Sequence, residues 1–142
     1  MIMWLSLQVR LHWVLMVLAT VLGVCGLAVI YYNKILNDKP HFTSWHGLIG
    51  AITVCFFVTQ TIGGIFVLYP AYAFGVLSKS SLRKYHIFCG CLLAIMGYMS
   101  FLLGLFSNWF VSKVSSTLWL ISGLPLSYWI MSVIVYNVKR LG

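Results

Sequence analysis

The stretch that decides the fold is Arg83–Gly104, RKYHIFCGCLLAIMGYMSFLLG, in which two basic residues introduce a long apolar segment. From His86 onward the segment carries no charge, and an apolar helix of about 20 residues is long enough to cross a bilayer. At helical spacing, a histidine, four small residues and a phenylalanine share one face. These residues are His86, Gly90, Ala94, Gly97, Phe101 and Gly104. Such a face predicts a helix whose backbone is approached closely by another group.

The first long apolar stretch repeats this arrangement. Its histidine and the residues that follow at helical spacing are His12, Met16, Ala19, Gly23 and Gly26. Two helices of this kind can hold a flat, bulky group between them. We expect haem, because neutral imidazole is a common axial ligand of iron. The alternatives are that the small residues only let helices pack closely, or that each histidine is an interfacial residue.

The composition excludes a soluble domain. Of 142 residues, 62% are hydrophobic and 7% are charged, and the mean hydropathy is +1.01. One acid, Asp38, stands against nine lysines and arginines, which lie between the apolar blocks rather than in one patch. They are typical of membrane topology signals, so no nucleic-acid partner is expected. Paired carboxylates, a Ser-His-Asp set and a phosphate-binding loop are absent from the sequence, so hydrolase or transferase chemistry has no support.

Four apolar blocks are long enough to span a bilayer, at about residues 12–32, 47–69, 86–107 and 117–136. We therefore expect an all-α membrane protein, with residues 1–142 forming a single transmembrane domain of four antiparallel helices. The block ends carry the aromatic residues of an interfacial belt: Tyr31, Tyr32, Trp45, Tyr69, Tyr72, Tyr85, Trp109 and Trp119. The last block has no histidine and contains Pro125, so we expect a kinked helix at the periphery.

Basic residues set the expected orientation. One side of the membrane receives six of them: Arg10, Lys79, Arg83, Lys84, Lys139 and Arg140. The other side receives three: Lys34, Lys39 and Lys113. The positive-inside rule then predicts that both termini are cytoplasmic. The residues do not identify the membrane, for which an endomembrane or a vesicle is our expectation.

This topology predicts where the histidines lie. His12 and His86 open two helices that start from the cytoplasmic side, so both imidazoles lie at one level and can ligate one haem. His46 opens a helix that starts from the opposite side and belongs to a second site. On the same helix Gln60 should face the bundle interior, because an unpaired amide in lipid is costly. His41, in a loop, is expected to be solvated. The four cysteines, which lie in apolar blocks, are expected to be buried free thiols.

The histidine motifs resemble those of the cytochrome b-561 family, in particular its domain-containing branch in animals. They are Arg10-Leu11-His12-Trp13, Ser44-Trp45-His46-Gly47 and Lys84-Tyr85-His86. Further similar segments are Gln60 with Gly63-Gly64, Leu68-Tyr69-Pro70 and residues 104–110. The resemblance covers nearly the whole chain. It implies a six-helix membrane protein with two b haems that carries electrons from cytoplasmic ascorbate to monodehydroascorbate or ferric iron. Carried over, His12 and His86 ligate the cytoplasmic haem and His46 ligates the outer one.

The chain departs from the family pattern in two places. The first two of the six helices have no counterpart, and with them goes the second ligand of the outer haem. Tyr32-Asn33 also lies where relatives often carry a histidine near the outer substrate site. The open alternatives are a truncated form, a ligand from a partner, or a lost outer haem. A non-catalytic membrane subunit that binds one haem or none is therefore the competing function.

Basic residues beside the expected inner haem are candidates for the donor site. Arg10, Arg83 and Lys84 can attract an anionic reductant such as ascorbate. Their alternative role is that of topology charges and snorkelling anchors, and the two roles are compatible. Because relatives dimerise, a homodimer is a further expectation.

Overall fold

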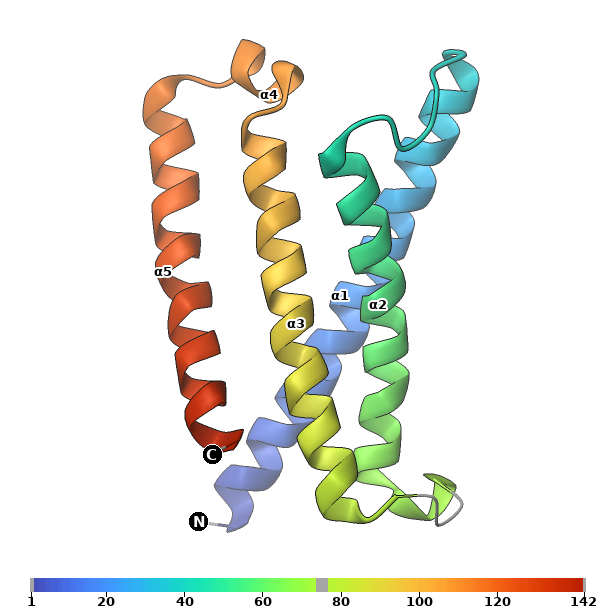
Figure 1. The fold of residues 1–142 in the computed structure, drawn as a ribbon, viewed down its shortest axis with the longest axis vertical. Helices are drawn as coiled ribbons and strands as arrows, with labels where there is room; N and C mark the ends of the chain where they lie inside the picture. Colours follow the sequence, from blue (N-terminus) through green and yellow to red (C-terminus); the bar gives the residue numbers. More distant parts are fainter. Residues whose placement is uncertain (1, 74–76, 142) are drawn as a thin grey trace.

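The computed structural model describes residues 2–73 and 77–141 of the chain. The side chains of residues 2–6, 73, 116, 119, 120, 122, 140 and 141 are not described. Trp119, expected in the aromatic belt, and Arg140, counted among the topology signals, therefore lie outside the described side chains. The described backbone forms five α-helices and a 3-10 turn (Figure 1): α1 Ile2–Leu36, α2 Trp45–Leu68, η1 Pro70–Ala73, α3 Lys79–Leu105, α4 Asn108–Lys113 and α5 Ser116–Leu141.

The chain forms a helical membrane bundle, as the sequence predicts. Three helices in the described part are long and apolar enough to cross a membrane: Leu7–Leu36, Trp45–Leu68 and Lys79–Leu105. Helix α5 has 26 residues and runs through Pro125, so its length also suffices, but its crossing stays a prediction. Large apolar side chains of α1, such as Leu22 and Val29, point outward rather than into a core. This exposure fits a lipid-facing surface.

The helices extend beyond the apolar blocks that predicted them. Helix α3 begins at Lys79 rather than near residue 86, and α4 lies within the expected link 108–116. Serine side chains explain the new starts, because Ser78 accepts a hydrogen bond from the Ser81 backbone amide and Ser107 accepts one from Phe110. Hydropathy marks the membrane core of a helix, whereas polar capping marks where the helix begins.

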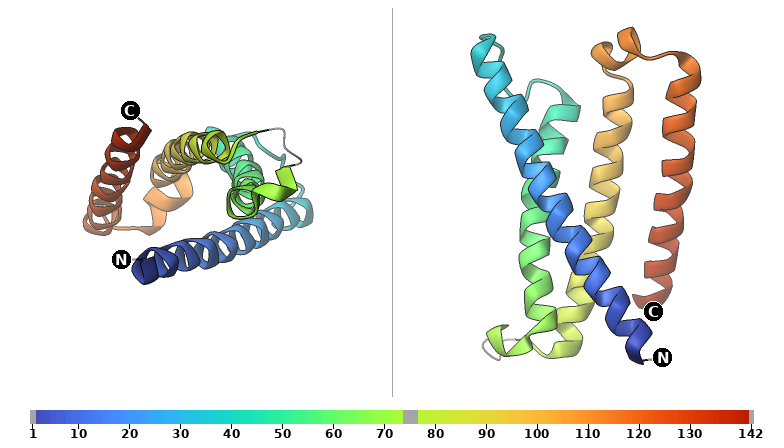
Figure 2. Two further views of the ribbon diagram at one scale, coloured as in Figure 1. Left: turned by 90° about the horizontal axis from the view of Figure 1, so that it is seen from below. Right: turned by 180° about the vertical axis from the view of Figure 1, so that it is seen from behind.

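The centre of the bundle is the antiparallel pair of α2 and α3. Helix α1 packs on α2, and α5 packs on α3. The views in Figure 2 show α1 crossing the α2–α3 pair obliquely and α5 at the edge of the bundle. Both termini lie at the same end, where α3 also begins (Figure 1). This arrangement fits the expected topology, while its orientation relative to the cytoplasm stays a prediction.

Candidate metal centre

Helices α1 and α3 bring His12 and His86 together. Their ring centroids are 6.5 Å apart and their planes are nearly perpendicular, at 87°. Metal–imidazole bonds of about 2 Å put the centroids of two imidazoles on opposite sides of one metal ion roughly 6 Å apart. The observed separation therefore fits a pair of axial ligands. The pairing expected from topology is the one that the structure forms.

The His86 imidazole is prepared on three sides by α2. A Cβ atom on Gly64 would lie 3.4 Å from His86 Cε1, so the absent side chain gives the ring its place. The Gln60 side-chain amide donates a 2.6 Å hydrogen bond to the His86 carbonyl oxygen, which confirms that Gln60 faces the interior. The Nδ1 atom of His86 is buried without a hydrogen-bond partner within the described residues. Since buried polar atoms are almost always paired, this nitrogen indicates a ring prepared for another contact.

His46 lies at the other end of the α2–α3 pair. Its Nδ1 is 2.8 Å from the Ser100 carbonyl oxygen, and an Nδ1 proton donated there leaves the Nε2 lone pair for a metal. The ring packs against Gly104, where a Cβ atom would lie 3.0 Å from His46 Cε1. Residues 2–73 and 77–141 contain no group of three or more histidine, cysteine, aspartate or glutamate residues that could hold a metal ion. His46 thus resembles one half of a ligand pair.

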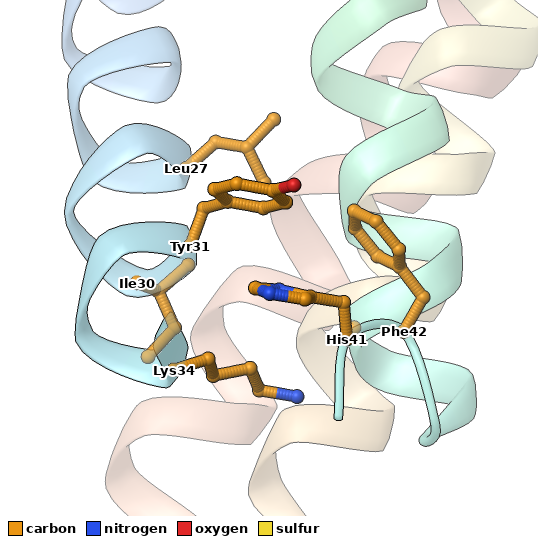
Figure 3. Close-up of a pocket in the computed structure, with 7 residues that line it drawn as sticks. Leu27, Ile30, Tyr31, Lys34, His41 and Phe42 are labelled. Carbon is orange, nitrogen blue, oxygen red and sulfur yellow. The ribbon is translucent and has the colours of Figure 1, made fainter. Parts of the chain in front are cut away.

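The loop histidine, His41, occupies a different setting from the one expected. It is half-buried and stacks on Tyr31 with ring centroids 4.1 Å apart, so the expectation of a solvated side chain is wrong. Figure 3 shows His41, Tyr31 and Phe42 around a pocket at the end of α1. The Lys34 amine donates a 2.9 Å hydrogen bond to the Pro40 carbonyl oxygen and ties down the loop. Sequence reasoning missed this cluster, although an aromatic residue at the end of a helix before a short loop was a usable signal.

The small-residue faces pack against α2 and not across a shared gap. On α3, a Cβ atom on Gly90 would lie 3.3 Å from Gln60 Nε2, and one on Gly97 would lie 3.8 Å from Thr53 Cγ2. On α1, a Cβ atom on Gly23 would lie 3.7 Å from a Val54 methyl carbon of α2. The expectation that these faces of α1 and α3 together enclose a flat group is therefore wrong. Small residues instead let the backbones approach closely, which was the alternative.

The predicted donor-site residues and the cysteines lie largely at the surface. Arg10, Arg83 and Lys84 are exposed, and each lies within three residues of His12 or His86 in the sequence. All four cysteines are free, as expected. Cys25 and Cys55 are exposed on the outside of the bundle, so the expectation that they are buried is wrong.

Comparison with known proteins identifies relatives over most of the chain. The family model for eukaryotic cytochrome b561 matches residues 4–111. A probable transmembrane reductase, CYB561D1 of Mus musculus, is 37% identical over 120 residues, which cover 84% of this chain and 52% of the relative. The transmembrane reductase CYB561D2 of Bos taurus is 32% identical over 134 residues, which cover 92% of this chain and 57% of the relative. The chain thus spans about half the length of these relatives. No solved structure matches it significantly.

Proposed function

Because this chain belongs to the eukaryotic cytochrome b561 family, we propose that it carries electrons in a membrane through b-type haem held by His12 and His86. The observation that carries this proposal is the 6.5 Å separation of the two imidazole centroids. Similar proteins are named transmembrane reductases. Since the chain covers about half of each, its own activity, substrates and partners are part of the proposal.

The chain's residues would hold and insulate the redox group. His12 and His86 would serve as the axial ligands, and Gly64 leaves room for the His86 ring. A bound haem supplies one-electron chemistry, so the protein itself needs little acid–base machinery. The apolar helices exclude water from the centre and, with the ligands, set the reduction potential. His46 would ligate a second haem at the opposite end if another ligand is supplied to it.

The charges at the His12 and His86 end support an anionic donor. Arg10, Arg83 and Lys84 are exposed, so they can attract a reductant such as ascorbate from the side that we propose is cytoplasmic. The acceptor on the other side would be monodehydroascorbate or ferric iron. The surrounding partner is the lipid bilayer of an endomembrane or vesicle, and a homodimer is the proposed assembly.

A second candidate function is a non-catalytic membrane subunit that binds one haem or none. It is favoured by the setting of His46, whose nearest described polar contact is a backbone carbonyl rather than another histidine. The remaining loop histidine, His41, stacks on Tyr31 instead. Such a subunit would retain the helix packing but would not pass electrons between the two membrane faces.

The deciding experiment is a reduced-minus-oxidised absorption spectrum of the purified chain, with haem counted per polypeptide. We expect a low-spin b-type spectrum in the wild type and in His41→Ala, and its loss in His12→Ala and His86→Ala. One haem per chain would support electron transfer that stops short of the His46 side, and two would support transfer across the membrane. A His12→Ala chain with full haem content would overturn the redox function and favour the subunit.

A further inference from the structure

Helices α2 and α3 correspond to each other residue by residue, with an offset of 40 positions. His46 and Gly64 are separated by 18 residues, and so are His86 and Gly104. Eighteen residues make about five helical turns, so each histidine and its glycine share a face. Each imidazole then packs on the glycine of the other helix, with His86 Cε1 3.4 Å from a Cβ atom on Gly64 and His46 Cε1 3.0 Å from one on Gly104.

The correspondence includes the side chains that contact the two histidine backbones. Gln60 follows His46 by 14 residues, and Ser100 follows His86 by 14 residues. The Gln60 amide donates to the His86 carbonyl oxygen at 2.6 Å, and the Ser100 hydroxyl donates to the His46 carbonyl oxygen at 3.5 Å. Each histidine is therefore tied through its own backbone to a polar side chain on the facing helix.

Two further glycines make room for these polar side chains. Gly50 and Gly90 each follow a histidine by four residues. A Cβ atom on Gly90 would lie 3.3 Å from Gln60 Nε2, and one on Gly50 would lie 3.1 Å from Ser100 Oγ. Both distances are tighter than ordinary contact, so an added methyl group would push the donor away from the carbonyl that it reaches.

The correspondence fails at one atom, and this failure makes Gln60 the more important of the two. The His46 ring has its own second contact, because Nδ1 meets the Ser100 carbonyl oxygen at 2.8 Å. The Nδ1 atom of His86 has no hydrogen-bond partner within the described residues. The ring of His86 is thus positioned through its backbone, and the 2.6 Å contact from Gln60 is the polar interaction that fixes that backbone to α2.

We propose that Gln60 is a positioning residue for His86, and that Ser100 has the corresponding, weaker role for His46. This inference rests on the proposed function, since it concerns haem ligation by His12 and His86. Gln60 does not touch the ligating ring. It holds α3 in register against α2, so that the His86 imidazole lies over Gly64 and faces His12. A polar side chain within a membrane span is costly unless paired, and this contact accounts for its presence.

The test compares Gln60→Met with Thr59→Val in the haem-loaded chain. Methionine keeps the length of glutamine but cannot donate, and Thr59 is an exposed neighbour on the same helix. We expect Gln60→Met to hold haem about fivefold more weakly, as expected for the loss of one hydrogen bond. Its low-spin electron paramagnetic resonance signal and its reduction potential should shift, while Thr59→Val matches the wild type.

Two outcomes would overturn the positioning role. One is a Gln60→Met chain whose haem affinity, resonance signal and potential equal those of Thr59→Val. The other is a Gln60→Met chain that loses thermal stability without haem yet has an unchanged haem signal, because Gln60 would then be purely structural. A wild-type chain without haem would instead overturn the proposed function, and with it any role in ligand positioning, so the two failures are distinct.

A second pair of variants applies if Gln60→Met does not fold. Gly90→Ala places a methyl group against the Gln60 amide, whereas Gly97→Ala places one at an ordinary contact distance of 3.8 Å from Thr53 Cγ2. Both substitutions add one methyl group to the same helix. We expect the haem signal to shift in Gly90→Ala and to stay unchanged in Gly97→Ala. Equal signals in the two variants would overturn the inference.

Discussion

The hydroxyl oxygens of Thr20 and Thr61 lie 2.7 Å apart where α1 crosses α2. Each also contacts a carbonyl oxygen in its own helix, that of Met16 at 2.7 Å and that of Phe57 at 2.9 Å. Helix α1 packs mainly on α2, so the position of His12 relative to His86 depends on this contact. The threonine pair therefore supports the histidine pair although it touches neither ring.

Removal of the threonine hydroxyls should loosen His12 from His86. We expect Thr20→Val and Thr61→Val each to lower the free energy of unfolding by about 1 kcal/mol. The double variant should lose less than the sum, because the first substitution already breaks the shared contact. Thermal unfolding in detergent, with haem content measured in parallel, tests this double-mutant cycle. Full additivity would show that the two hydroxyls do not interact, and Thr59→Val serves as the exposed control.

The seat of His46 predicts a difference between two glycines. In Gly104→Ala the new methyl group would meet His46 Cε1 at 3.0 Å, whereas a Cβ atom on Gly26 has nothing within 4 Å. Both substitutions favour the helix by up to about 1 kcal/mol, but only the first creates an overpacked contact that costs about 1–3 kcal/mol. We expect Gly104→Ala to unfold at a lower temperature than Gly26→Ala. Equal unfolding temperatures would show that the His46 ring moves away at no cost.

The sequence predicted the parts of this site that follow from membrane topology. Apolar runs located the spans, and alternating span directions placed His12 and His86 at one end of the bundle. The pairing of their rings then followed from two parallel helices. The same reasoning put Gln60 inside the bundle, because an amide in a span needs a partner. These inferences require only the order and direction of the helices.

Other features depend on which helices touch, and periodicity does not contain that information. The small face of α3 was correctly located, but the residues that cover it belong to α2, as the contact of Gly97 with Thr53 shows. The setting of His41 depends on a loop in which Phe42 has a φ of 55°, a left-handed conformation that local sequence rarely predicts for phenylalanine. The start of α3 depends on the Ser78 cap, which hydropathy does not reveal.

The contact between α3 and α5 should contribute to stability and not to the haem signal. The Tyr98 hydroxyl donates a 2.6 Å hydrogen bond to Ser127 Oγ, and Ser127 donates in turn to the Gly123 carbonyl oxygen at 2.7 Å. In Tyr98→Phe the serine keeps its own acceptor, so we expect a loss of only about 1 kcal/mol. Thermal unfolding of Tyr98→Phe should show this loss, whereas the exposed control Tyr128→Phe should not. A changed haem spectrum in Tyr98→Phe would contradict the assignment of α5 to a packing role.

Charge at the His12 and His86 end should govern the rate at which an anionic donor reduces the protein. Arg83 and Lys113 are both exposed, but Lys113 lies at the end of α4, on the opposite side of the bundle (Figure 1). We expect Arg83→Gln to slow haem reduction by ascorbate about threefold at low ionic strength, because a cation beside the site raises the local concentration of an anion. The difference should shrink at 1 M salt, where the screening length falls to about 3 Å. Stopped-flow reduction of the two variants at both salt concentrations tests this prediction. Equal slowing by Lys113→Gln would mean that net charge matters and the position of Arg83 does not, and a salt-independent loss in Arg83→Gln would point to a direct contact with the donor.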